Sequence, residues 1–270
     1  MSFRRRQFLW AASAGAVGIA LPRFGPAEGP RASLKLGLGT YTFRTLDLSQ
    51  LIGRCRELHL WSIELSHPQY MLPQARLEEF PSIKAQLKSA GLEVVSWFFG
   101  HLSERAGIEA MVEGAQSLGV KIVSGSAERP LLDEIDTACG KAGLAFGIHN
   151  HYFKDRKFIY ESPEDVLSAI SGHHNIVSTL DTGHMIALGI DPTEAYRRMK
   201  EHVRIIHIKD EDVPGHSVVL GKGKGNLAHF VRTLVQDSFP GLVAIEYEEG
   251  TDPKEEVSEC AKYVRVRLES

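Results

Sequence analysis

Short runs of β-branched and other apolar residues alternate along the chain with longer segments in which apolar residues recur at helical spacing. This alternation is typical of βαβ units, in which helices join the parallel strands of a sheet. The eight expected strands are residues 34–39, 61–65, 93–98, 121–124, 144–149, 176–181, 205–209 and 242–247. The amphipathic segments between them include residues 81–90, 108–118, 130–142, 163–170, 192–202 and 227–236.

Eight βα rounds can form an open doubly wound sheet or a closed barrel, and glycine motifs help to separate the two. The glycine-rich stretch 221–225 (Gly-Lys-Gly-Lys-Gly) has neither the GxGxxG order of a dinucleotide site nor the GxxxxGK[ST] spacing of a phosphate loop. We interpret it as a substrate lid or a solvated turn. The length also suits one barrel domain, which typically has about 250 residues. The sequence therefore predicts an α/β fold, a single (β/α)8 TIM barrel.

The amino-terminal segment differs from the rest of the chain. Arg4, Arg5 and Arg6 precede an uncharged, largely apolar stretch that ends at Pro22. This stretch is shorter than the ~20 apolar residues that a transmembrane helix needs. We therefore expect a cleavable signal and no stable membrane insertion, with an uncleaved anchor helix as the alternative.

The position of Arg5 and Arg6 before Phe8 resembles a twin-arginine export signal, whose cargo crosses the membrane already folded. We expect residues 1–31 to form a signal peptide and linker, and residues 32–270 to form the barrel domain. The twin-arginine export machinery is then a partner. The mature protein is expected to be exported, in the periplasm or outside the cell.

Composition describes an ordinary globular protein. Hydrophobic residues make up 43% of the chain and charged residues 24%, with a formal net charge of -3. Because there is no basic excess, no nucleic-acid partner is expected. Cys55, Cys139 and Cys260 lack CxxC spacing, so we expect buried free thiols, which suit folding in a reducing cytoplasm before export. The oligomeric state stays open.

Ionisable residues gather where the expected strands end. In a (β/α)8 barrel these carboxyl ends carry the chemistry, and side chains at i and i+2 share one face of a strand. This alternation turns His149, Asp181, His207 and Glu246, from four consecutive strands, toward the barrel axis. Two imidazoles and two carboxylates suit one ion of Mn, Co, Zn or Fe better than Mg. For Glu246 alone, an ion pair with Lys209 is the alternative.

Other polar side chains are expected at the same barrel mouth. Glu64 ends the second expected strand and is either a substrate contact or a structural ion-pair partner. His151 shares the inner face with His149, so it either replaces His149 as a ligand or orients the substrate. We interpret His67 and His101 as substrate contacts because of their position, with plain loop surface as the alternative.

Five short stretches occur in an order and at separations that resemble the sugar phosphate isomerase/epimerase family, which has the xylose isomerase-like TIM barrel. They are 147–151 (GIHNH), 180–184 (LDTGH), 207–210 (HIKD), 220–223 (LGKG) and 245–247 (IEY). The resemblance covers essentially the whole chain after the signal. It implies that Asp181, His207 and Glu246 bind the metal and that His184 and Lys209 lie near the substrate.

One departure from the family pattern bears on the reaction. Ketose 3-epimerases of this family carry a glutamate on strand five that binds metal and acts as one of two bases, whereas this chain has His149, Asn150 and His151. The departure argues against a two-glutamate epimerisation. It resembles the branch that contains inosose dehydratase and enzymes that cleave 3-keto-glycosides by elimination.

The resemblance implies a divalent-metal-dependent isomerase or epimerase that removes a proton beside the carbonyl of a keto sugar and stabilises the enediolate. Glu246 is the expected base, and His149, His151 or Lys209 delivers a proton to the opposite face or to a departing oxygen. Burial beside the ion is expected to lower the pKa of Lys209. One alternative is a lyase or hydratase that eliminates across a 3-keto-glycoside or an inosose-like substrate. The other is a sugar-binding protein without turnover.

Overall fold

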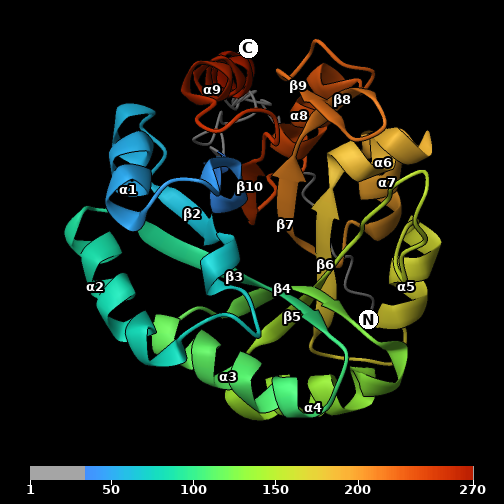
Figure 1. Ribbon diagram of the computed structural model, residues 1–270. Coiled ribbons are helices and arrows are strands. Elements are labelled where there is room, and N and C mark those ends of the chain that lie inside the picture. The colour runs from blue at the N-terminus through green and yellow to red at the C-terminus, as the bar shows by residue number, and fades with distance from the viewer. Residues whose placement is uncertain (1–33, 270) are drawn as a thin grey trace, which may run out of the picture. The chain divides into compact units, whose positions relative to one another are not determined.

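The computed structural model describes residues 34–269, whose main strands close into a barrel (Figure 1). Eight parallel strands follow one another in the order β1-β10-β7-β6-β5-β4-β3-β2. Their bounds are β1 Lys35–Gly39, β2 Ser62–Leu65, β3 Glu93–Leu102, β4 Ile122–Ala127, β5 Ala145–His149, β6 Ile176–Asp181, β7 Val203–Ile208 and β10 Leu242–Ile245. The predicted TIM barrel is confirmed. The predicted signal and linker, residues 1–31, lie outside the described residues.

Helices cover the outside of the barrel, and Figure 1 shows α2, α3 and α4 along the side formed by β3, β4 and β5. The α-helices are α1 Leu48–Glu57, α2 Phe80–Ser89, α3 Ala106–Leu118, α4 Leu132–Ala142, α5 Pro163–Ile170, α6 Thr182–Leu188, α7 Pro192–Met199, α8 Leu227–Gln236 and α9 Lys254–Glu269. Both α5 and α7 begin with proline after a capping residue, Ser162 and Asp191, whose side chains accept backbone N–H groups.

Side chains alternate between the interior of the barrel and the helical layer, as predicted. Ile205, Leu242 and Ala244 form a small buried cluster of their own. Their sequence neighbours Ile206 and Ile245 belong to the main core between sheet and helices. Because residues at i and i+2 share a face, the polar residues that continue the inner rows of β7 and β10 project into the barrel mouth.

Two strands, β3 and β4, continue beyond the carboxyl ends that the sequence predicted. The pairing of β3 with β4 continues to His101 and Ser126 and on to the ends of both strands, with a register shift between Phe98 and Gly100. Gly100 has φ 102°, which a residue with a side chain rarely adopts, so the bulge needs glycine there. His101, which lies beyond the predicted end of the strand at residue 98, is therefore part of β3.

A short antiparallel hairpin, which the sequence analysis did not expect, follows β7. It pairs β8 Asp210–Val213 with β9 His216–Val218. In Figure 1 it lies beyond the end of β7 and beside α6, against which β8 packs. The hairpin therefore stands at the end of the barrel that carries the polar cluster.

The three cysteines are buried free thiols, as predicted. Burial raises the pKa of Cys55 and of Cys139 to about 12, so neither thiol is reactive near neutral pH. Among residues 34–269, none of the helices combines the length and hydrophobicity needed to cross a bilayer.

Candidate metal centre and active site

Asp181, the last residue of β6, lies at the centre of a buried polar cluster. The distances from its Oδ2 are 3.2 Å to Lys209 Nζ, 3.4 Å to His149 Nε2, 3.7 Å to His207 Nδ1 and 3.9 Å to His184 Nε2. Burial raises the pKa of Asp181, but Lys209 and His184 outweigh burial and hold it well below its usual range. Asp181 is therefore ionised among four nitrogen atoms.

Asn150 positions Asp181 by bridging β5 to β6. Its Nδ2 donates to the carbonyl oxygen of Asp181 at 3.0 Å, and its Oδ1 accepts the Asp181 N–H at 2.8 Å. Asp181 Oδ1 accepts the N–H of His184 at 3.0 Å and so caps α6. Asn150 thus fixes the backbone of Asp181, and the His184 N–H orients the carboxylate, with Oδ2 left to face the cluster.

His207 on β7 is held from the opposite side of its ring by Glu64 of β2. The two side chains share a hydrogen bond through His207 Nε2, and Glu64 also accepts from Ser96 Oγ at 2.9 Å. His207 Nδ1 therefore faces Glu246 Oε2 at 3.3 Å and has no hydrogen-bond partner among the described residues. Burial lowers the pKa of His207, but Glu64 and Glu246 hold it well above its ordinary value.

Two overlapping groups of side chains have ligand atoms close enough to hold a metal ion. Asp181, His207 and Glu246 form one group, and His149, Asp181 and His184 form the other, with the ligand atoms of each group within 4.8 Å of one another. Nδ1 of His207, which faces Asp181 and Glu246, is buried without a hydrogen-bond partner in the described chain. This orphaned nitrogen and the mixed donor set fit an ion such as Mn, Co, Zn or Fe.

The structure thus brings the four predicted ligands together and adds one candidate. His184, which the resemblance placed near the substrate, is close enough to Asp181 to compete with His149 for the same role. The sequence signal for His184 was its place in the Asp-Thr-Gly-His stretch. Its orientation depends on α6, a helix that the sequence analysis did not include.

Lys209 is fully buried and surrounded by carboxylates. Its Nζ lies 2.7 Å from Glu248 Oε1 and 3.8 Å from Glu246 Oε2, in addition to its contact with Asp181. Burial lowers the pKa of Lys209, but Asp181, Glu248 and Glu246 together hold it well above its ordinary value. The expected lowering of the pKa applied to Lys209 beside a bound ion, and without an ion the three carboxylates set the direction instead. Gly183 makes room for the side chain, because a Cβ there would lie 2.5 Å from Lys209 Cε.

The cluster opens into a cavity of about 210 Å³, called the catalytic cavity below. Glu246 and Glu248, which follow β10, line it together with His149 and His151, which end or follow β5. The two strands are three steps apart around the barrel. Carboxylates and imidazoles therefore enter the catalytic cavity from separate parts of its wall.

His151 and His184 are stacked in the wall of the catalytic cavity. Their ring centroids lie 4.0 Å apart, and the ring centroids of Phe158 and His151 lie 4.3 Å apart. Burial, followed by His149 and Lys209, lowers the pKa of His151 to about 3. Burial and Lys209 also hold the pKa of His184 well below its ordinary value. Both rings are therefore neutral near pH 7, and each can donate one hydrogen bond and accept another.

The other predicted substrate contacts, Glu64, His67 and His101, lie outside the lining of the catalytic cavity. Glu64 holds His207, as described above, and is not part of the lining of the catalytic cavity. His67 caps the turn Pro68–Tyr70, and its Nε2 lies 3.1 Å from the Leu46 carbonyl oxygen, so it organises a loop. His101 lines an adjoining cavity. The structure thus assembles His151, His184 and Lys209 at the site, and places Glu64 and His67 behind it.

The glycine-rich stretch binds a carboxylate of the protein itself. The N–H groups of Gly221 and Gly223 donate to Asp210 Oδ2 at 2.8 and 3.1 Å, and that of Gly225 donates to Oδ1 at 3.0 Å. Lys222 pairs with Glu259 on α9 at 2.8 Å. The spacing of the glycines, which fits no nucleotide motif, is explained by the Asp210 side chain that they surround.

Two acids near the cluster were not predicted. Glu248 follows Glu246 at i+2, so the alternation that identified Glu246 could have identified it. Glu211 on β8 is 2% exposed, and its Oε2 accepts the N–H of Gly215 at 2.8 Å. Burial raises the pKa of Glu211 to about 7. Its burial depends on the hairpin, for which the sequence offered no periodic signal.

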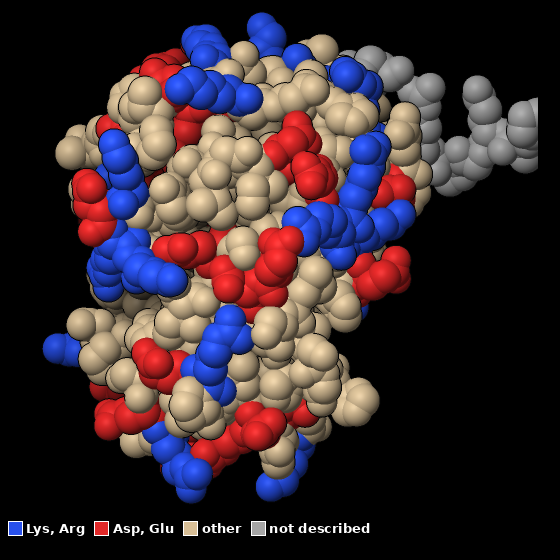
Figure 2. Space-filling model, turned by 90° about the vertical axis from the view of Figure 1, so that its right-hand side faces the viewer, with Lys and Arg blue, Asp and Glu red and all other residues tan. Residues whose placement is uncertain are grey.

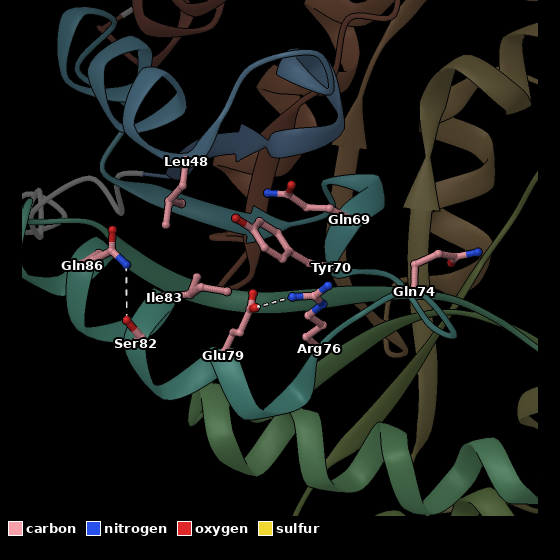
Figure 3. Close-up of a pocket in the computed structure, with 9 residues that line it drawn as sticks. All are labelled: Leu48, Gln69, Tyr70, Gln74, Arg76, Glu79, Ser82, Ile83 and Gln86. Atoms are coloured by element: carbon pink, nitrogen blue, oxygen red, sulfur yellow. Dashed lines mark hydrogen bonds and ion pairs between the residues drawn. The ribbon is translucent and has the colours of Figure 1, made fainter.

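Cavity size and surface charge do not by themselves locate this chemistry. Figure 3 shows a larger cavity of about 600 Å³ around Tyr70, Arg76 and Glu79, on the outer side of the barrel near α2. Its lining contains one ion pair, between Arg76 and Glu79 at 3.3 Å, and no histidine or aspartate. On the face in Figure 2, acidic and basic side chains are interspersed.

Several solved structures share this fold at low sequence identity. An L-ribulose 3-epimerase has a TM-score of 0.72 and 17% identity, over 87% of this chain and 94% of that one. The apo form of an E. coli 3-keto-D-glucoside 4-epimerase has a TM-score of 0.71 and 14% identity, over 87% and 100%. A probable 3-DHS dehydratase from Bacillus anthracis has a TM-score of 0.69 and 15% identity, over 86% and 99%.

At such identities the likeness establishes the fold and nothing further about activity. None of the curated proteins matches the chain. The family assignment comes from the sequence match, which covers most of the described barrel. Residues 52–265 match the xylose isomerase-like TIM barrel family, and the chain belongs to that family.

Proposed function

We propose that this protein is a divalent-metal-dependent enzyme that takes a proton from the carbon beside the carbonyl of a keto sugar. The observation that carries the proposal is the buried set of Asp181, His207 and Glu246, with ligand atoms within 4.8 Å of one another beside the catalytic cavity. Neighbours in fold that are named as epimerases and as a dehydratase support a small polyhydroxylated substrate.

Asp181, His207 and Glu246, together with His149 or His184, would hold the ion. When bound, a divalent ion polarises the carbonyl and a neighbouring hydroxyl of the substrate, which acidifies the adjacent C–H bond and stabilises the enediolate. Glu64 supports this arrangement from behind, because its hydrogen bond to His207 Nε2 turns Nδ1 toward the other ligands.

Glu246 is the proposed base. It lines the catalytic cavity, and although burial raises its pKa, His207 and Lys209 outweigh burial and hold the pKa below its ordinary value. Glu246 is therefore ionised and able to accept a proton. Lys209 stays charged, so it restrains the carboxylates of Glu246 and Glu248 and offsets the negative charge that develops on the substrate.

His149 and His151 are the proposed proton donors on the other side of the substrate. Both line the catalytic cavity from β5, away from the two glutamates on the β10 side. His151 is neutral near pH 7, so one ring nitrogen carries an N–H group and the other accepts a hydrogen bond. The N–H proton goes to the opposite face of the carbon or to a departing oxygen, while the other ring nitrogen takes up a proton from water, so that the ring stays neutral.

Elimination is the second candidate reaction, and the end of β5 favours it. An epimerisation with two carboxylates needs one on each face of the carbon, but Glu246 and Glu248 both follow β10, and β5 ends with His149. One carboxylate that removes a proton, facing an imidazole that protonates a leaving oxygen, suits a lyase. Its substrate would be a 3-keto-glycoside or an inosose-like ring.

Incubation with keto sugars and 3-keto-glycosides in deuterated water tests the proposal. Mass spectrometry of the products separates the two reactions, since epimerisation adds deuterium without changing the composition, whereas elimination releases water or an alcohol. Glu246→Gln should abolish both outcomes. Binding of a sugar without deuterium exchange or product would overturn the enzyme proposal and favour a sugar-binding protein.

Export through the twin-arginine route is also proposed, on the strength of Arg5, Arg6 and the apolar stretch after them. Export favours a free or glycosidic sugar over a phosphorylated one, because sugar phosphates are intracellular metabolites. Cell fractionation tests the proposal, since the Arg5→Lys/Arg6→Lys variant should remain in the cytoplasm. Equal export of the variant and the original chain would refute it.

A further inference from the structure

A second cavity adjoins the catalytic cavity and shares a wall with it. The catalytic cavity measures about 210 Å³ and the second about 390 Å³, and Phe98, His149 and His151 line both. Cavities that hold small molecules usually measure about 300–1,000 Å³. The catalytic cavity alone lies below this range, whereas the two cavities together lie within it.

The second cavity has a hydrogen-bonding side and an apolar side. His101 Nδ1 lies 2.7 Å from Ser126 Oγ, and His101 Nε2 lies 3.4 Å from Glu128 Oε1, so the extended ends of β3 and β4 present a row of polar groups. The ring of Phe158 also lines the cavity, with the Arg156 guanidinium 4.8 Å from its centroid. A ring with hydroxyl groups at its edge and C–H groups on its face matches both sides.

Charged side chains of both signs line the second cavity. Glu128, which follows β4, and Arg156 and Lys157, which lie between β5 and α5, all line it. A phosphate or carboxylate would face the Glu128 carboxylate, and a cation would face the two basic side chains. A neutral, hydroxyl-rich group can accept hydrogen bonds from the basic residues and donate one to Glu128.

We infer that the second cavity is a subsite for a second sugar ring, so that the substrate is a glycoside that spans both cavities. Its keto-sugar ring occupies the catalytic cavity, and the ring attached to it contacts His101, Glu128 and Lys157. His149 and His151 form the shared wall, so the bond between the two rings passes beside an imidazole. The inference rests on the proposed function of the catalytic cavity, and it adds the class of substrate.

Two probes with the same keto-sugar ring test this inference: methyl 3-keto-β-D-glucopyranoside and 3-keto-cellobiose, which differ in the second ring. Deuterium exchange gives kcat/KM for each probe with the original chain and with Glu128→Ala and Lys157→Ala, both at exposed positions. His174→Ala is the matched control, because His174 is exposed and precedes β6 at the opposite end of the barrel.

The original chain should prefer the disaccharide by about tenfold or more in kcat/KM. Glu128→Ala and Lys157→Ala should each remove most of this preference, mainly through KM, and His174→Ala should keep it. Equal kcat/KM for the two probes, or equal losses on both probes in the variants, would overturn the subsite. If neither probe exchanges deuterium, the proposed function fails, and calorimetric affinities of the same probes decide the subsite by the same criteria.

Discussion

Glu211→Gln is expected to remove a pH dependence of folding stability that the original chain has between acidic and mildly alkaline pH. Glu211 lies on β8, is 2% exposed, and accepts the Gly215 N–H at 2.8 Å. Burial raises its pKa to about 7, against the opposing effects of that N–H group and of Lys209. Glutamine keeps the length of the side chain and an oxygen for the Gly215 hydrogen bond, but it cannot ionise.

The magnitude follows from the pKa of Glu211 in the two states. The ordinary pKa of 4.5 applies to the unfolded chain, and about 7 applies to the folded one. A carboxyl group whose pKa is higher in the folded state than in the unfolded state stabilises the fold fully at pH values below its unfolded pKa. This contribution is lost as the pH rises through its folded pKa. The difference of about 2.5, at about 1.4 kcal/mol for each pH unit, gives a ceiling of about 3.5 kcal/mol.

Urea unfolding at a series of pH values from about 5 to 8 measures this contribution. The samples contain a chelator, since a cation near Asp181 would stabilise the ionised form of Glu211. The free energy of unfolding of the original chain should fall, relative to that of Glu211→Gln, by up to about 2.5 kcal/mol across this range. Glu113→Gln, at an exposed position of α3, is the matched control and should run parallel to the original chain.

Parallel curves for the original chain and Glu211→Gln would refute the reasoning. They would mean that Glu211 ionises as it does in the unfolded chain, and hence that the β8–β9 hairpin does not remove it from water. A slope of the opposite sign would mean that the positive charge of Lys209 outweighs burial at this position.

Two further substitutions test contacts at the site. Glu64→Gln should weaken metal affinity by about 10- to 100-fold, because it alters the partner that orients His207, and competition with a fluorescent chelator measures this. Equal affinities would contradict that role. Gly183→Ala should cost about 1–3 kcal/mol, because its Cβ would lie 2.5 Å from Lys209 Cε. Gly53→Ala on α1, with nothing within 4 Å of its Cβ, should be neutral or stabilising. Urea unfolding measures both variants, and a larger loss of stability in Gly53→Ala than in Gly183→Ala would contradict the close contact at Gly183.

Periodicity predicted the elements that bury one face against the core. The bounds expected for residues 163–170, 176–181 and 227–236 agree with those of α5, β6 and α8. Helix α1 was not predicted, although Asp47 and Gln50 form a capping box at its start. The β8–β9 hairpin is too short for a periodic signal, and its position depends on the contact of β8 with α6.

The candidate site was predictable to the extent that strand alternation decides it. His149, Asp181, His207 and Glu246 all lie where the alternation of inward and outward side chains placed them. For Glu64 the sequence left two alternatives, a substrate contact or a structural ion-pair partner, and the structure shows the second. Its partner, His207, could not be predicted because it lies on a strand that is distant in sequence.

The direction of the pKa shift of Lys209 could not be predicted from the sequence. It is the balance between burial, which lowers the pKa, and three carboxylates, which raise it. One of those carboxylates belongs to Glu248, which the sequence analysis had not placed at the site. A pattern in the sequence identifies which side chains face inward, but the sum of their charges requires the distances between them.

Metal content, measured by mass spectrometry of the purified protein and two variants, tests the central claim most directly. Asp181→Ala removes the carboxylate that faces four nitrogen atoms, and Asp133→Ala, at a side chain that is 99% exposed, is the matched control. Circular dichroism verifies that all three proteins are folded. We predict about one ion per chain in the original protein and in Asp133→Ala, and its loss in Asp181→Ala. A folded original chain without metal, or an Asp181→Ala variant that retains it, would contradict the metal centre.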